Sequence, residues 1–134
     1  MSLVLDTHVL VWLIDGNDRL GQASRQLIDI TWQSDLISVS AITFWEIALL
    51  QEKGRIELPE PVVDWRQHVL DEGVTEVPVS GDIGIASVML RDFHSDPADR
   101  IIITTAMMNS AQLVTADASI LSWSGDLIRH NASF

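Results

Sequence analysis

The stretch Ser95–Asp117, SDPADRIIITTAMMNSAQLVTAD, joins a helix start rich in carboxylates to an apolar helix, a short turn and a strand. Asp96 can cap this helix, Pro97 fits its first position and Asp99 falls in its first turn. Apolar groups then cover most of the helix surface: Ile101, Ile102, Ile103, Ala106, Met107 and Met108. A helix that is apolar on nearly every side is typical of a buried position.

The same stretch ends in a short apolar strand, Leu113–Thr115, with Asp117 just beyond it. A helix and the parallel strand that follows it run in opposite directions, so the helix start and the strand end meet at one edge of the sheet. Asp99 and Asp117 are therefore expected at the same edge. Asp96 is more simply interpreted as a plain helix cap.

Composition indicates a globular protein with one domain. A chain of 134 residues can bury roughly two-thirds of its unfolded surface. No apolar run approaches the roughly 20 residues that span a bilayer, and the N-terminus lacks a basic region and cleavage site typical of a signal peptide. Met1–Leu3 could include a cloning remnant. The chain has no cysteine, which excludes disulfides and thiolate sites and favours the cytoplasm.

The net charge of −11 argues against a nucleic-acid binder that works through a basic patch. Any nucleic acid would have to be held in another way, for example through bound metal ions.

Strands and helices alternate along the rest of the chain. Strands are expected at Leu3–Leu5, Leu36–Val39, Val74–Val79 and Leu127–Arg129, and helices at His8–Ile14, Leu20–Trp32, Ala41–Glu52, Val62–Leu70, Gly81–Arg91 and Ala118–Trp123. This alternation predicts an α/β fold whose mostly parallel sheet, of four to five strands, has helices on both faces. With no repeat and no linker, residues 1–134 are expected to form a single domain.

Two further acids follow strands or sit among apolar residues. Asp6 directly follows Leu3–Leu5, where it is either a helix cap or a functional carboxylate. Glu46 is the only charged residue between Ala41 and Leu50, and a carboxylate in an apolar face is either paired or functional. In parallel sheets, ligands bind outside the carboxyl ends of the strands.

The sequence therefore predicts one site that holds Asp6, Glu46, Asp99 and Asp117. Like charges about 4 Å apart repel by roughly 4 kcal/mol at an effective dielectric near 20, so this set requires cations. Oxygen ligands favour Mg²⁺ or Mn²⁺ over zinc. Such a site, without a glycine-rich nucleotide loop, favours metal-assisted phosphodiester hydrolysis, in which one ion activates water and another stabilises the leaving oxygen.

These acids lie in four short motifs, and together the motifs resemble those of PIN-domain proteins. The motifs are Leu5–His8 with Trp12–Leu13, Phe44–Ala48, Asp96–Arg100 and Leu113–Asp117. More narrowly, they resemble the VapC-like toxins of type II toxin–antitoxin pairs, over nearly the whole chain.

The resemblance implies a three-layer α/β/α fold, an Mg²⁺- or Mn²⁺-dependent endoribonuclease, and a homodimer that an antitoxin neutralises. By motif position, Asp6, Glu46, Asp99 and Asp117 correspond to the catalytic residues and ligands of one or two ions. Thr7, Ser40 and Thr115 correspond to donors that orient these carboxylates.

This chain departs from the family pattern at two positions. Many relatives carry a lysine where this chain has Leu50, and a basic residue where it has Ser95. Both departures remove positive charge near the expected RNA path.

Two other protein classes that gather acids at strand ends do not fit the sequence. A phospho-acceptor receiver domain needs a lysine after a late strand, whereas Lys53, the only lysine, lies in the middle of the chain. A haloacid-dehalogenase-like phosphatase needs an aspartate where this chain has His8. The remaining alternative is a PIN-like scaffold that binds RNA or protein without cleavage.

For an antitoxin, we expect a segment with a basic residue flanked by large apolar ones. Trp12 and Trp32 could line its groove or simply pack in the core.

Overall fold

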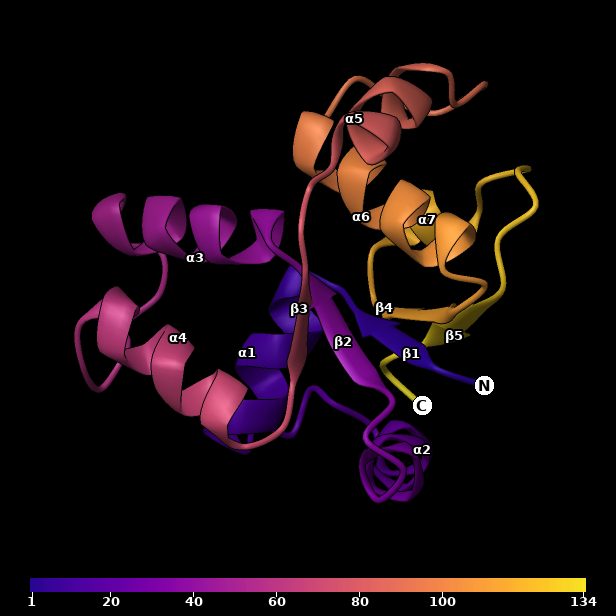
Figure 1. Cartoon of the computed structure of the whole chain (residues 1–134). Coiled ribbons are helices and arrows are strands. Elements are labelled where there is room, and N and C mark those ends of the chain that lie inside the picture. Colours follow the sequence, from indigo (N-terminus) through magenta and orange to yellow (C-terminus); the bar gives the residue numbers. More distant parts are fainter.

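Five parallel strands form the centre of the computed structural model, which describes residues 1–134 (Figure 1). They are β1 (Leu3–Leu5), β2 (Ile37–Ser40), β3 (Thr75–Val77), β4 (Gln112–Thr115) and β5 (Arg129–Asn131). Their order across the sheet is β3-β2-β1-β4-β5, with Leu3 of β1 opposite both Ile37 and Gln112. The expected parallel sheet is confirmed, and β3, which Pro78 follows, lies at an edge as expected for a strand near a proline.

Seven helices connect and cover the strands. They are α1 (Thr7–Asp15), α2 (Gln22–Trp32), α3 (Ile42–Glu52), α4 (Val62–Asp71), α5 (Gly81–Val88), α6 (Pro97–Met108) and α7 (Ala118–Leu121). In Figure 1, α1 and α2 lie below the sheet, whereas α5, α6 and α7 lie above it. The layers are therefore α/β/α, as the alternation of strands and helices predicts. No helix has the length and apolar character that a membrane crossing needs.

The central strand β1 divides the interior into two cores. Leu3 and Leu5 belong to a cluster with side chains of α1, α2, α3 and α4, whereas Val4 packs with α6 and α7. Successive side chains of a strand point to opposite faces, so β1 must be apolar at every position to be buried on both. This is why the short run Leu3–Leu5 is wholly apolar.

The path of the chain creates the site. From β1 the chain adds β2 and β3 on one side, then returns with β4 to the other side of β1. The direction of strand addition reverses between β1 and β4, and in such sheets ligands bind at the carboxyl ends beside that reversal. Asp6 follows β1 and Asp117 follows β4, so both acids flank this position.

Several element boundaries differ from the sequence expectation, and two of the differences have a physical reason in the structure. The last strand is Arg129–Asn131 instead of Leu127–Arg129, because Leu127 is buried in the core while still in the preceding loop. Helix α5 ends at Val88, short of the expected Arg91. There the guanidinium of Arg100 donates hydrogen bonds to the backbone carbonyls of Val88 and Leu90, which a longer helix would use for its own hydrogen bonds.

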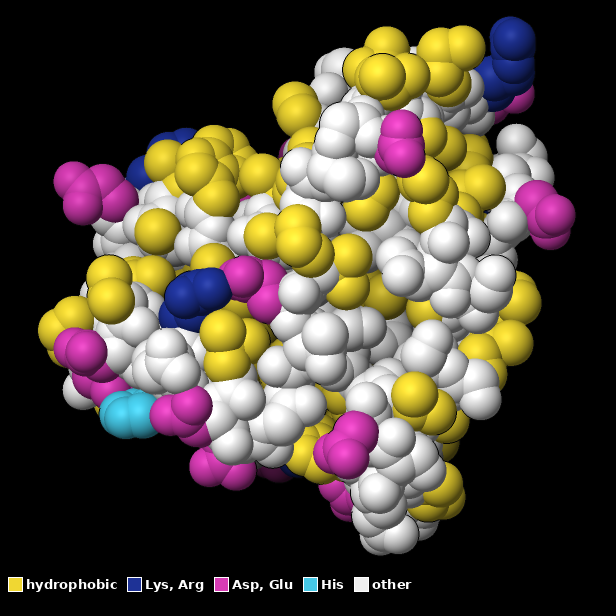
Figure 2. Space-filling model, viewed as in Figure 1, with side chains coloured by type: hydrophobic (Ala, Val, Ile, Leu, Met, Phe, Trp, Pro, Cys, Tyr) yellow, Lys and Arg dark blue, Asp and Glu magenta, His cyan; other side chains and the backbone are white.

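The expectation that α6 is buried on every side is wrong at its C-terminal end. Met107 and Met108 reach solvent, although Ile102 and Ile103 one turn or more earlier are fully buried. Nearby, α5 also presents apolar side chains to solvent, Ile85 and Val88 among them, and Figure 2 shows hydrophobic side chains over this helix. An apolar pattern alone does not distinguish a buried helix from one with an uncovered end.

Candidate functional site

Asp6 forms the first part of the site at the junction of β1 and α1. Its carboxylate accepts hydrogen bonds from the Thr7 backbone N–H (2.8 Å) and the Thr115 hydroxyl (2.7 Å). The side chain is 6% exposed, and this burial raises the pKa of Asp6 despite both hydrogen bonds. Asp6 is thus the N-cap of α1 and at the same time a buried carboxylate, so its role as a cap does not exclude a functional role.

Glu46 reaches the same junction from the middle of α3. Its Oε1 accepts a hydrogen bond from the Thr7 hydroxyl (2.5 Å), and the Thr43 hydroxyl lies 3.1 Å from that of Thr7. Because Thr7 gives its only hydroxyl proton to Glu46, Thr43 must donate to Thr7. Burial, with the neighbouring charges of Asp6 and Asp96, raises the pKa of Glu46.

Asp117 occupies the junction of β4 and α7, where it caps α7. Its Oδ1 accepts from the Ser119 N–H (2.9 Å), the Ser119 hydroxyl (2.5 Å) and the Ile120 N–H (3.1 Å). Burial alone would raise the pKa of Asp117, but these hydrogen bonds outweigh it and lower the pKa. The Asp117 N–H in turn donates to the Thr115 hydroxyl (3.0 Å), so Thr115 contacts both strand ends.

Asp99, in the first turn of α6, brings the acids together. Burial and the negative charges of Asp6, Asp96, Asp117 and Glu46 raise the pKa of Asp99 to about 8. Its carboxylate is therefore close enough to each of the other acids to be affected by their charge. The structure gathers the acids that the sequence assigned to one site.

The donor set suits a hard divalent cation. It consists of carboxylate oxygens, the ligands that Mg²⁺ and Mn²⁺ prefer. In this structure, no three Asp, Glu or His side chains lie close enough to one another to coordinate a single metal ion. A pKa of about 8 at Asp99 means that a proton is retained near neutral pH to relieve repulsion, and a cation would fulfil the same role.

Ser40 does not act as the sequence predicted. Its buried hydroxyl accepts a hydrogen bond from the Ile42 N–H (3.2 Å), where α3 begins, and donates to none of the four carboxylates. The first N–H groups of a helix have no partner within it, and Ser40 supplies one. Thr43, which the sequence reasoning missed, takes the place beside Thr7.

His94 is a second residue that the sequence reasoning missed. Its Nε2 lies 3.4 Å from Asp99 Oδ2 and 3.0 Å from the Ser119 hydroxyl. Its place in the sequence, two residues before Asp96, was the available signal.

The family model described as PIN domain matches residues 3–122. The chain belongs to the PIN-domain family. It is also 37% identical, over 122 residues, to Ribonuclease VapC22 from Mycobacterium tuberculosis, with 90% of this chain and 91% of the relative covered.

Solved structures confirm the PIN fold. VapBC2 from Rickettsia felis, bound to a promoter DNA fragment, matches with a TM-score of 0.73 and 17% identity, over 98% of both chains. A toxin–antitoxin complex from Klebsiella pneumoniae matches with a TM-score of 0.63 and 20% identity, over 95% of this chain and 96% of that one. At these identities the likeness concerns the fold.

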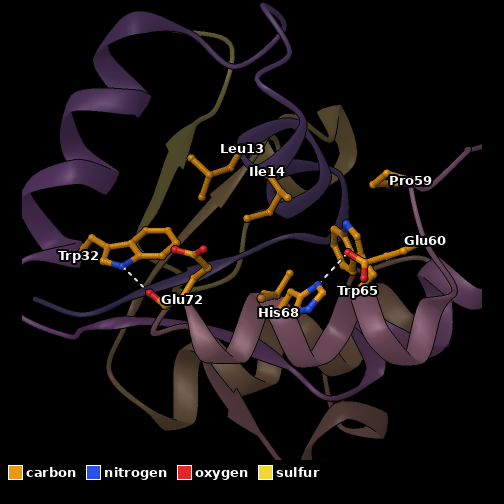
Figure 3. Close-up of a pocket in the computed structure, with 9 residues that line it drawn as sticks. Leu13, Ile14, Trp32, Pro59, Glu60, Trp65, His68 and Glu72 are labelled. Carbon is orange, nitrogen blue, oxygen red and sulfur yellow. Dashed lines mark hydrogen bonds and ion pairs between the residues drawn. The ribbon is translucent and has the colours of Figure 1, made fainter.

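A hollow of about 380 Å³ lies elsewhere on this PIN domain, among α1, α2, α4 and the segment that precedes α4 (Figure 3). Its lining includes none of the four acids. Trp32 lines it and donates from Nε1 to the Glu72 carbonyl (3.0 Å), whereas Trp12 is half-buried beside the ring of His8. Of the two tryptophans, Trp32 lines this hollow and Trp12 does not.

Proposed function

We propose that this PIN domain is a divalent-metal-dependent endoribonuclease and the cytoplasmic toxin of a type II toxin–antitoxin pair. The observation that carries the proposal is the coupling of Asp99 to Asp6, Glu46 and Asp117 at the carboxyl edge of the sheet. The relative named a ribonuclease supports RNA as the substrate. A scaffold that only binds would gain nothing from four carboxylates that repel one another.

Asp6, Glu46, Asp99 and Asp117 would hold one or two Mg²⁺ or Mn²⁺ ions. When bound, such ions activate a water molecule for attack on the phosphodiester and stabilise the leaving oxygen. The protein orients the ligands beforehand. The Thr115 hydroxyl holds Asp6, and the Thr7 hydroxyl holds Glu46.

The metal would also make RNA binding compatible with the charge of the chain. A chain with 8 basic and 19 acidic residues repels a polyanion at long range. Leu50 and Ser95 place no positive charge beside the carboxylates. We therefore expect RNA affinity itself, besides cleavage, to depend on the divalent ion.

The experiment is cleavage of end-labelled single-stranded RNA by the metal-free protein to which Mg²⁺ or Mn²⁺ is returned. We expect internal cuts with either ion, none with EDTA, and loss of cleavage in Asp117→Asn. RNA binding without cleavage in the presence of both ions would favour the scaffold alternative. Cleavage that survives in Asp117→Asn would move the reaction to another site.

For the antitoxin, we propose contact at two places on α1. Asp6 caps the start of this helix, and Leu13 and Ile14 near its end line the hollow in Figure 3. About 10 Å of helix separates the two places, at a rise of about 1.5 Å per residue. Apolar antitoxin side chains would fill the hollow, and a nearby arginine or lysine would enter among the carboxylates in place of metal.

A peptide titration tests this arrangement. A peptide with a basic residue flanked by large apolar ones should bind more weakly as Mg²⁺ or salt rises. Trp32→Ala should weaken binding at every Mg²⁺ concentration, because it removes apolar surface from the hollow and leaves the four carboxylates unchanged. Affinity that ignores Mg²⁺ would mean that inhibition does not act through the carboxylates.

We also propose a homodimer, in which the uncovered apolar side chains of α5 and the end of α6 meet a second copy. Ile85, Met89, Met107 and Met108 line a hollow of about 560 Å³ on this face. Light scattering should give twice the chain mass, and Ile85→Asp should give a monomer.

A further inference from the structure

The loop between α5 and α6, residues 89–96, is tied to the side chain of Arg100. Every N–H of this guanidinium donates to a backbone carbonyl, at 2.8 to 3.3 Å. The acceptors are the carbonyl oxygens of Ser87, Val88, Leu90, Phe93 and His94. The basic residue that directly follows Asp99 therefore holds the loop and has no donor left for RNA or for a carboxylate.

Aromatic packing holds the same loop from a second side. The Phe93 ring lies with its centroid 4.0 Å from that of His94 and 5.9 Å from that of Trp123, in an edge-on contact. Trp123 also donates from Nε1 to the Arg91 carbonyl (2.8 Å). His94 thus projects from a loop fixed by backbone and side-chain contacts together, although its own side chain is 41% exposed.

The hydrogen bonds of His94 have a defined direction. Its Nδ1 lies 3.2 Å from the Asp96 backbone nitrogen, whose N–H donates to it, so the ring proton is on Nε2. Nε2 lies 3.0 Å from the Ser119 hydroxyl oxygen and 3.4 Å from Asp99 Oδ2, and its single N–H is assigned to the nearer of the two, Ser119. That hydroxyl gives its own proton to Asp117 Oδ1, so it accepts from His94. The donors run from Asp96 to His94, from His94 to Ser119, and from Ser119 to Asp117.

This chain of donors leaves the two oxygens of Asp117 unequal. Oδ1 accepts from the N–H and hydroxyl of Ser119 and from the Ile120 N–H, while Oδ2 accepts none of these bonds. We propose that His94 is a positioning residue that acts through Ser119 to hold Asp117, so that Oδ2 stays available to a divalent cation. The inference rests on the proposed function, because it assigns Asp117 to a metal. Residues that orient metal ligands in this way typically change metal affinity 10- to 100-fold when removed.

The first arm of the test is independent of metal. Nitrogen NMR of the metal-free protein, labelled with ¹⁵N-histidine, should show His94 protonated at Nε2. Ser119→Ala should shift the Nε2 resonance of His94, whereas Ser122→Ala should leave it in place, because the Ser122 hydroxyl bonds to the Ser119 carbonyl instead. A ring protonated at Nδ1, or a resonance that ignores Ser119→Ala, would overturn the inference.

The second arm measures Mn²⁺ affinity by calorimetry, without RNA. His94→Ala should weaken binding about 10-fold, and His94→Gln should recover part of the loss because its amide N–H can donate at the position of Nε2. His68→Ala is the matched control, since His68 is also exposed and paired with a carboxylate, Glu60, but lies away from the four acids. If a thermal melt shows that His94→Ala does not fold, the Mn²⁺ affinities of His94→Gln and Ser119→Ala are compared with that of His68→Ala instead.

A double variant separates a shared action from two independent ones. If His94 acts only through Ser119, His94→Ala combined with Ser119→Ala should bind Mn²⁺ no more weakly than Ser119→Ala alone. Additive losses, or normal affinity in His94→Ala, would overturn this inference and leave the proposed function standing. A wild-type protein that binds neither Mn²⁺ nor Mg²⁺ would overturn both.

Discussion

The ends of β1 and β4 lie side by side, and each is followed by an aspartate whose pKa is shifted in the opposite direction from the other. At each end an aspartate follows the strand and caps a helix, Asp6 for α1 and Asp117 for α7. Yet the pKa of Asp6 is raised by burial, while that of Asp117, also penalised by burial, is lowered by its hydrogen bonds. The topology alone does not set the charge state.

The difference comes from the helix that follows each strand, α1 after β1 and α7 after β4. α1 is long and packs against the sheet, so Asp6 is enclosed and receives only two hydrogen bonds. α7 is a single turn that begins with exposed residues, and there Ser119 and Ile120 direct several donors toward Asp117. One strand end therefore supplies a carboxylate that gains most from a cation, and the other supplies one that is already ionised.

The strongest test of this comparison is cleavage by Asp6→Asn. Asn retains the size and capping ability of Asp but cannot bring a negative charge to the ion. Since changing a residue that only orients a metal ligand costs 10- to 100-fold, we expect at least about 100-fold loss of RNA cleavage. Asp29→Asn, at an exposed position of α2, is the matched control and should cleave like wild type.

Thermal melts with metal test whether both strand ends contribute to one site. Because Mg²⁺ or Mn²⁺ should bind only the folded protein, an ion at about 100 times its dissociation constant adds about 2.7 kcal/mol, or roughly 10 °C in Tm. The shift should shrink strongly in both Asp6→Asn and Asp117→Asn. Equal shifts in wild type and both variants would place the metal elsewhere.

Thr115 joins the two ends, so its hydroxyl should contribute more to stability than that of another buried threonine. Thr115→Val leaves Asp6 Oδ2 without its donor and the Asp117 N–H without an acceptor, and should cost about 1–3 kcal/mol in urea unfolding. Thr105→Val is the control, because the Thr105 hydroxyl donates to the Ile101 carbonyl within α6. Equal losses would mean that Thr115 does not couple the two ends.

Much of the site could be predicted from sequence because it follows from topology. An acid after β1 and another after β4, with Glu46 as the only charge in an apolar helix face, predict that these acids lie at one edge of a parallel sheet. The pairing of Thr7 with Glu46 and of Thr115 with Asp6 agrees with the family motifs.

The rest depends on tertiary contacts that leave no local pattern. Whether a hydroxyl faces a carboxylate or a helix start distinguishes Thr43 from Ser40, which lie three residues apart. The role of Arg100 in ending α5 depends on carbonyls up to 13 residues before it. Whether Met107 and Met108 at the end of α6 are covered depends on what packs against them in the fold.

The pH dependence of the metal-free protein tests the electrostatic contrast. Unfolded Asp99 ionises near 3.8, while in the fold its pKa is about 8, so the folded state holds the extra proton between these values. Stability, measured as Tm, should therefore fall as pH rises from 5 to 8.5. Asp99→Asn should flatten this slope. Asp117→Asn should flatten it only in part, because it removes one of the four negative charges that raise the pKa of Asp99.

The smallest effect is expected for Asp6→Asn in the absence of metal. The buried carboxylate pays for desolvation and for repulsion from Asp117, and both costs vanish with the charge. Against this, Asn has one carbonyl oxygen to replace the two carboxylate oxygens, so it can accept from the Thr7 N–H but not also from Thr115 with the same geometry. These effects oppose each other, and we expect a change in unfolding free energy within about 1 kcal/mol, neutral or stabilising. Urea unfolding in EDTA measures it, with Asp6→Ala as the companion variant, which loses the cap and should be less stable by about 1 kcal/mol. If Asp6→Asn unfolds the protein while Asp117→Asn does not, the main role of Asp6 is structural, through its paired hydrogen bonds with Thr7 and Thr115. The metal site would then rest on Asp117, Asp99 and Glu46 alone.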